Sequence, residues 1–114
     1  MNLILLTFSN RRSIFRMKFI VVMSRKAKED FEQLSPSQKS AVKNDYSIIE
    51  KIGIEFVKRR FLEDGIFEIK TGEIRTLFKF EENRIIIIGL IYVKKTQKIP
   101  KQILKLAKKR FGGL

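Results

Sequence analysis

The residues of this sequence best suited to chemistry are cations grouped near its C-terminal end. Lys94, Lys95 and Lys98 stand close together directly after a long apolar run. After Glu82 the chain has no acidic residue, while nine lysines and arginines follow. Loops at the ends of rigid strands often carry functional groups. We therefore predict that this basic loop binds a polyanion, and we expect the later lysines to form a solvated helix face.

The charge of the whole chain supports the same expectation. Its formal net charge is +13, from 25 basic and 12 acidic residues. Such an excess attracts polyanions, of which nucleic acid, an anionic membrane surface and an acidic protein are the three candidates. A basic surface that only aids solubility is the alternative.

The absence of two residue types limits the possible chemistry. The chain has no Cys and no His, which excludes disulfides, thiolate metal sites and the usual acid–base group of ribonucleases. The carboxylates are scattered without metal-ligand spacing, so we expect no metal and no other cofactor. Any catalysis must use Lys, Arg, Glu, Asp, Tyr or Ser.

The length of 114 residues fits one domain. We place this domain at residues 17–114 and interpret residues 1–16 as an extension, with Met17 as the hypothetical native start. In the extension the basic residues follow the apolar stretch, unlike in a signal peptide, and no run is long enough to span a membrane. We therefore expect a cytoplasmic protein without a membrane partner.

The elements that must position the basic loop can be predicted from periodicity. Residues 18–23 have strand composition, and Ser24 can cap a helix over 25–34. Ser35, Pro36 and Gln38 form a capping-box start for a second helix that ends at Gly53, so we expect a helical hairpin.

The second half of the chain has strand character. After a basic connection at 58–60, strands are predicted at 66–70, 74–80 and 84–93, followed by a helix over 100–111. The order β-α-α-β-β-β-α predicts an α+β domain, because helices must cover the inner face of so small a sheet.

Three blocks of the sequence resemble, in order, motifs of HigB-like toxins of the RelE/ParE toxin–antitoxin superfamily. They are residues 62–70 (LEDGIFEIK), 74–78 (IRTLF) and 92–100 (YVKKTQKIP), and the last is the most specific. Three positions depart from the family pattern: Lys70 stands where Arg is common, Ile99 where Thr is usual, and Tyr92 where Phe is usual.

The resemblance implies a fold, an activity and partners. The expected fold is RelE-like, a small antiparallel sheet packed against an N-terminal helical hairpin and a C-terminal helix. The expected activity is that of a metal-independent endoribonuclease, an mRNA interferase that acts on ribosome-bound mRNA and inhibits translation. The expected partners are mRNA, the ribosome and a cognate antitoxin, commonly a HigA-like helix-turn-helix protein.

The resemblance also implies site residues. RNA supplies its own nucleophile, the 2′-hydroxyl, so the enzyme must mainly stabilise a dianionic phosphorane. Arg75 is the expected phosphate clamp, unless it is a strand arginine paired with Glu68 or Glu73. Lys70 is the candidate base if its neighbours favour loss of its proton, and otherwise a solvated lysine. Strand alternation, and not the resemblance, adds Glu68: it falls on the same strand face as Lys70, so it could orient that lysine, act as the base, or form only a salt bridge.

The remaining expected contacts are with RNA, and they comprise Lys94, Lys95, Lys98, Tyr92 and Arg110. Tyr92 could donate a proton or stack on a base, although plain packing is the alternative. Two other functions stay open: a ParE-like toxin that inhibits DNA gyrase without catalysis, and a basic nucleic-acid-binding module without toxicity.

Overall fold

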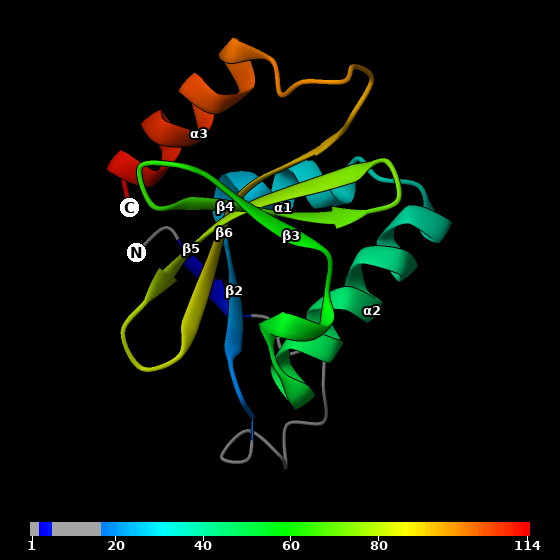
Figure 1. Ribbon diagram of the computed structural model, residues 1–114, viewed down its shortest axis with the longest axis vertical. Coiled ribbons are helices and arrows are strands. Elements are labelled where there is room, and N and C mark those ends of the chain that lie inside the picture. The colour runs from blue at the N-terminus through cyan, green and yellow to red at the C-terminus, as the bar shows by residue number, and fades with distance from the viewer. Residues whose placement is uncertain (1–2, 6–16) are drawn as a thin grey trace.

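A mixed sheet runs through the middle of the protein, with its strands in the order β1-β2-β6-β5-β4-β3 (Figure 1). The computed structural model describes residues 3–5 and 17–114. Its elements are β1 (Leu3–Leu5), β2 (Ile20–Ser24), α1 (Arg25–Glu32), α2 (Pro36–Ile52), η2 (Ile54–Phe56), β3 (Arg59–Glu63), β4 (Ile66–Thr71), β5 (Ile74–Glu81), β6 (Ile85–Val93) and α3 (Lys101–Gly112). The predicted α+β class is confirmed.

One strand pair differs from the predicted antiparallel sheet. β2 runs parallel to β6, with Val21 opposite Ile86 and Met23 opposite Ile88, while the other neighbouring pairs are antiparallel. Parallel neighbours need a crossover connection, and the long segment from α1 through β5 supplies one. The sequence predicted that residues 1–16 are an extension outside the domain. Most of them lie outside the described residues, but residues 3–5 are described and form β1 beside β2.

The prediction of a basic connection at 58–60 is wrong, because β3 begins at Arg59. This strand is largely exposed and lacks the apolar alternation that marks a strand in the sequence. The sequence marks this strand only through the turn that follows it, where Asp64 and Gly65 have φ angles of 51° and 74°. Asp-Gly with two positive φ angles is typical of a two-residue hairpin turn, which requires a strand on each side.

The predicted helix starts are confirmed. Ser24 accepts a hydrogen bond from the Ala27 amide, and Ser35 forms a capping box with Gln38 in which each side chain accepts the other's backbone N–H. These bonds satisfy amides that have no partner within the helix. They fix where α1 and α2 begin, and Gly53 ends α2 as predicted.

Loss of the α2 capping box should lower stability. Ser35→Ala removes the acceptor for the Gln38 amide, so we expect the free energy of unfolding to fall by about 1 kcal/mol in urea titration. Ser40→Ala, in the exposed interior of the same helix, is the matched control and should cause no loss. Equal stability of the two variants would contradict a stabilising cap.

Helices cover both faces of the sheet, and Figure 1 shows the sheet between α3 and α2. The larger core lies under α1 and α2 and includes Val21, Phe31, Val42, Tyr46, Ile49, Ile69, Phe78 and Ile88. The core under α3 is smaller and consists of Ile66, Leu77, Leu90 and Ala107 with partly buried neighbours. The α3 face therefore leaves room for polar side chains beside a short apolar core. No helix in the described part of the chain is long and apolar enough to cross a membrane.

Candidate active site

Three charged side chains meet on the α3 face of the sheet, one each from β3, β4 and β5. Glu68 is 1% exposed, and its Oε1 accepts a hydrogen bond from Arg60 Nε at 3.0 Å. The same oxygen lies 3.7 Å from Arg75 Nε. We call Arg60, Glu68 and Arg75 the arginine–glutamate cluster. The sequence left open that Arg75 pairs with Glu68, and the structure places the two side chains within ion-pair distance.

The Arg75 guanidinium is also held by the backbone. Its Nη1 donates to the carbonyl oxygen of Gly72 at 2.6 Å and to that of Ile74 at 3.1 Å. Both carbonyls belong to the turn and strand that carry Arg75, so the side chain is folded back onto its own hairpin. Arg75 is only 9% exposed, so the backbone carbonyls and Glu68 hold its guanidinium in one orientation at the protein surface. Donors that are held in place beforehand favour electrostatic stabilisation of an anion that reaches them.

A surface pocket of about 550 Å³ opens beside Arg75, between the β4–β5 turn and the loop after β6. Its lining consists of Glu73, Arg75, Lys94, Lys95, Thr96 and Gln97. The Lys94 amide donates to the Glu73 carbonyl at 2.6 Å, which fastens the start of the loop to the turn. The structure therefore brings Arg75 together with Lys94 and Lys95, although a whole strand separates them in the sequence.

Lys70 and Tyr92 lie on either side of Arg75. Each is its partner in strand register, Lys70 across β4–β5 and Tyr92 across β5–β6. Neither is among the residues that line the pocket. The Tyr92 hydroxyl is buried and has no hydrogen-bond partner within the described residues. Burial raises the pKa of this hydroxyl and the Glu68 carboxylate raises it further, so Tyr92 stays protonated at neutral pH.

Lys98 lies outside this pocket. It is exposed and lines a neighbouring pocket with Arg60, Phe61 and Leu104. The two pockets share Gln97, so the basic loop borders both of them.

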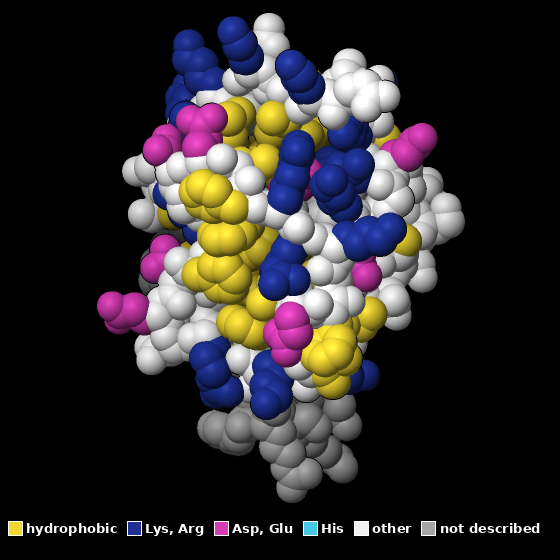
Figure 2. Space-filling model, viewed as in Figure 1, with side chains coloured by type: hydrophobic (Ala, Val, Ile, Leu, Met, Phe, Trp, Pro, Cys, Tyr) yellow, Lys and Arg dark blue, Asp and Glu magenta, His cyan; other side chains and the backbone are white. Residues whose placement is uncertain are grey.

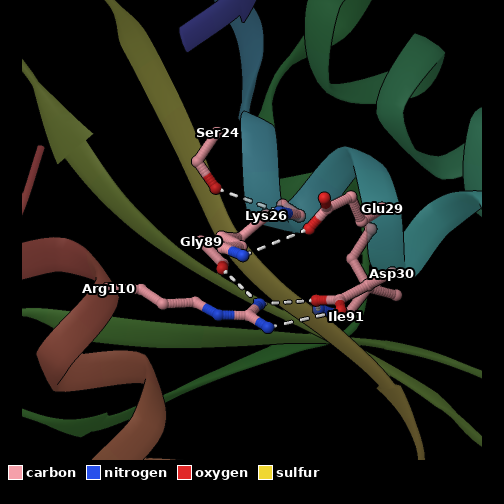
Figure 3. A network of polar contacts seen from close by, with 8 residues as sticks. Ser24, Lys26, Glu29, Asp30, Gly89, Ile91 and Arg110 are labelled. Atoms are coloured by element: carbon pink, nitrogen blue, oxygen red, sulfur yellow. Dashed lines mark hydrogen bonds and ion pairs between the residues drawn. The ribbon is translucent and has the colours of Figure 1, made fainter. Parts of the chain in front are cut away.

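Arg110 belongs to a different network of polar contacts, which joins it to Asp30 and Gly89 (Figure 3). Its Nη1 lies 2.7 Å from Asp30 Oδ2 and donates to the Gly89 carbonyl at 3.0 Å. Asp30 also accepts a hydrogen bond from the Ile91 amide at 3.0 Å. The network joins α1, β6 and α3, so the structure gives Arg110 a role in positioning the last helix. Its predicted contact with RNA stays a prediction.

Gly89 takes part in this network through its carbonyl oxygen, which accepts from Arg110. The register between β5 and β6 shifts there, because Leu77 pairs with Leu90 and Phe78 with Ile88. A Cβ atom on Gly89 would lie 2.6 Å from the Phe111 ring. The Phe111 ring of α3 therefore fills the space that a side chain at position 89 would occupy, and a substitution there would have to displace the ring.

Sequence reasoning missed Arg60 and Glu73 as site residues. Arg60 would have been found by following the Asp-Gly turn signal back to β3, since hairpin register places it opposite Glu68. Glu73 was considered only as a partner for Arg75, and no sequence signal marks it as a pocket residue. Among the described residues, no group of three or more Asp and Glu side chains is placed to hold a metal ion.

Comparisons with known proteins agree with this architecture. The family model for phage derived protein Gp49-like (DUF891) matches residues 29–112. Among solved structures, a chain of the toxin–antitoxin complex RelBE2 from Mycobacterium tuberculosis is similar, with a TM-score of 0.54 and 17% identity. The match covers 67% of this chain and 98% of that chain, and it confirms the predicted RelE-like fold. No curated protein matches the sequence.

Proposed function

The chain belongs to the phage-derived Gp49-like family, and from this premise we propose that it is a HigB-like toxin of a type II toxin–antitoxin pair that cleaves mRNA. The resemblance of residues 62–70, 74–78 and 92–100 to HigB-like motifs supports the assignment, and so does the fold shared with a chain of the RelBE2 complex. The proposed setting is the cytoplasm, where the toxin cuts ribosome-bound mRNA and inhibits translation. A HigA-like helix-turn-helix antitoxin is the proposed inhibitor.

The observation that carries this proposal is the fixed Arg75 guanidinium beside Lys94 and Lys95 in one open pocket. Attack of a ribose 2′-hydroxyl on the adjacent phosphate builds a second negative charge on the non-bridging oxygens. In the proposed complex, the planar fork of Arg75 binds these oxygens and the two lysines add positive charge. Since the nucleophile belongs to RNA, the protein need supply only charge, orientation and proton transfer.

Proton transfer requires a base at the pocket. Glu73 is the acidic residue in the pocket lining, and we propose it as the proton acceptor for the 2′-hydroxyl. Lys70, beside Arg75 in register, is the second candidate. Glu68 is buried and bonded to Arg60, so we assign it the role of positioning Arg75 instead of acting as a base.

Tyr92 is the proposed proton donor to the leaving 5′-oxygen. Its hydroxyl stays protonated and has no bonding partner within residues 3–5 and 17–114. Tyr92 is the register partner of Arg75 on β6, so it lies beside the arginine that is proposed to bind the phosphate.

Induced expression followed by mapping of the 5′ ends of cellular mRNA tests the proposed function. We expect growth to stop and new 5′ ends to appear inside translated codons. In vitro, purified folded protein should cut an mRNA only while ribosomes translate it. Gyrase-linked DNA breaks with intact mRNA would support the ParE-like alternative, and unchanged growth would support a nucleic-acid-binding module without toxicity.

The basic loop gives a quantitative test of RNA contact. The test is the slope of a plot of the logarithm of the binding constant against the logarithm of the salt concentration. If Lys94, Lys95 and Lys98 each contact a phosphate, each contact should contribute about −0.7 to this slope. Changing all three lysines to Gln should flatten this slope by about 2. Changing the exposed α3 residues Lys101 and Lys105 to Gln is the control and should leave the slope nearly unchanged. Equal slopes for the two variants would show that the loop does not bind RNA.

A further inference from the structure

Glu68 lies between two arginines, which come from the strands on either side of β4. Arg60 on β3 is its partner in strand register, and Arg60 Nε donates to Glu68 Oε1 at 3.0 Å. Arg75 on β5 has its Nε 3.7 Å from the same oxygen, which is an ion-pair distance but too long for a hydrogen bond. The Glu68 carboxylate is therefore bonded to Arg60, and Arg75 lies just outside hydrogen-bond range.

The same site contains the buried polar side-chain atoms that lack a hydrogen-bond partner within residues 3–5 and 17–114. They are Glu68 Oε2, Arg75 Nε and the Tyr92 hydroxyl. Most buried polar atoms in folded proteins are hydrogen-bonded, and an unpaired one is unfavourable. Arg75 Nε and Glu68 are therefore a donor and an acceptor that would bond to each other if the carboxylate were released from Arg60.

Burial of Glu68 determines what would follow such a release. Glu68 is 1% exposed, whereas the Arg60 side chain is 43% exposed. A buried carboxylate needs a cationic or hydrogen-bonding partner, because it has lost its water. Without Arg60, the cation that remains within ion-pair distance of Glu68 in the described structure is Arg75. The carboxylate would then move to Arg75 and neutralise the charge of its guanidinium.

We propose that Arg60 is a positioning residue, which holds Glu68 away from Arg75 and so keeps the charge of Arg75 available to bind an anion. Two arginines and one glutamate give the arginine–glutamate cluster one net positive charge, and loss of Arg60 would leave it with none. Arg60 is not among the residues that line the pocket with Arg75, so it acts through Glu68. Its role in mRNA cleavage rests on the function proposed above, whereas its role in anion binding does not.

Two simpler roles for Arg60 make different predictions. If Arg60 served only to neutralise the buried Glu68, its loss would lower stability but leave anion binding by the folded protein unchanged. If Arg60 bound the anion itself, its loss would weaken binding whichever residue stood at position 68. The proposed role predicts that loss of Arg60 weakens anion binding and that loss of the Glu68 charge reverses this effect.

Two variants test the proposal with inorganic phosphate as the probe. The dissociation constant is measured on the purified full chain from the NMR signal of the Arg75 Nε–H group. Arg60→Met removes the donor but keeps an unbranched side chain, and it should weaken phosphate binding by about tenfold. Adding Glu68→Gln should restore the affinity to within about threefold of that of the unmodified protein. The proposal fails if the second change restores nothing, or if phosphate does not shift the Arg75 signal of the unmodified protein.

The control must account for the many other cations on this surface. Figure 2 shows Lys and Arg side chains gathered beside a band of hydrophobic side chains, and together they attract anions from all sides. Arg59→Met removes the same charge from the neighbouring position of the same exposed strand, where the register partner is the apolar Ile69. It should weaken phosphate binding by less than about twofold, since exposed charges are screened by salt. Equal weakening by Arg59→Met and Arg60→Met would contradict the proposed role.

The arginine signals also give a test that does not depend on whether Arg60→Met folds. In the unmodified protein, phosphate should shift the Arg75 Nε–H signal more than that of Arg60. A larger shift at Arg60 would make it the phosphate ligand and would reject its role as a positioning residue. In a folded Arg60→Met protein, the Arg75 Nε proton should exchange more slowly with water, because it is then bonded to Glu68.

Cleavage of a translated mRNA by the same proteins separates this proposal from the proposed function. The single-turnover rate should fall at least about tenfold in Arg60→Met and recover when Glu68→Gln is added. A chain whose phosphate binding follows the predicted order but that cuts no mRNA would keep the role of Arg60 and reject the nuclease. A chain that cuts mRNA equally fast as Arg60→Met and as Arg59→Met would keep the nuclease and reject the role of Arg60.

Discussion

Arg75→Ala should abolish growth inhibition and slow mRNA cleavage by about 10²- to 10³-fold, the usual cost of losing one preorganised donor to a transition-state oxyanion. The physical reason is that no other guanidinium lines the pocket in the described structure. Lys94 and Lys95 keep positive charge there, but an ammonium cannot bind two phosphate oxygens in parallel as a guanidinium can. The measurement is the single-turnover rate of cleavage of a translated mRNA.

Two further variants make this prediction specific. Arg75→Lys keeps the charge but loses the planar fork, so its rate should lie between those of the Ala variant and the unmodified protein. Arg25→Ala removes an exposed arginine at the start of α1 and should cut normally. Circular dichroism must show that each variant is folded. A folded Arg75→Ala protein that remains fully toxic would remove Arg75 from the site.

The second large effect concerns stability. Asp30→Ala should lower the free energy of unfolding by about 2–3 kcal/mol in urea titration. It removes the partner of Arg110 and the acceptor for the Ile91 amide in one step. Loss of a fully buried partner costs about 3–5 kcal/mol, and the exposures of 17% for Arg110 and 21% for Asp30 reduce the expected loss.

A neighbouring acidic residue provides the control. Glu29 forms an exposed ion pair with Lys26 one turn earlier in the same helix. Glu29→Ala should therefore change stability by less than about 0.5 kcal/mol. If both variants unfolded at the same urea concentration, the Asp30–Arg110 network would not hold α3 to the sheet. If a folded Arg110→Met protein still bound mRNA normally, Arg110 would have a structural role and no contact with RNA.

Local signals in the sequence determined most of the elements. Ser24, Ser35 and Gln38 fix helix starts because capping depends on residues at most three apart. The apolar run of β6 likewise matches a strand that is buried along most of its length. The alternation of β5 predicts the strand but not its burial, since Ile74 to Phe78 are all buried. These features predicted the α+β class and the elements other than β1, η2 and β3.

Tertiary structure alone decided three things. The parallel pairing of β2 with β6 depends on how the long connection returns the chain, which no local pattern encodes. The ion pair of Arg110 with Asp30 joins positions that are 80 residues apart. Nothing in the basic segment around Arg110 indicates this partner. The convergence of Arg75 with Lys94 and Lys95 depends on strand register and on the bond from the Lys94 amide to Glu73.

The difference between what the sequence determined and what the tertiary structure decided has a physical cause. Residue type and spacing along the chain set which groups are present and which local structure they favour, so the sequence identified cations without histidine as the available chemistry. Whether a cation meets a carboxylate, a carbonyl or an open pocket is decided by contacts between strands and helices that are distant in sequence. Glu68 shows the difference, because its charge is read from the sequence but its burial between two arginines exists only in the folded sheet.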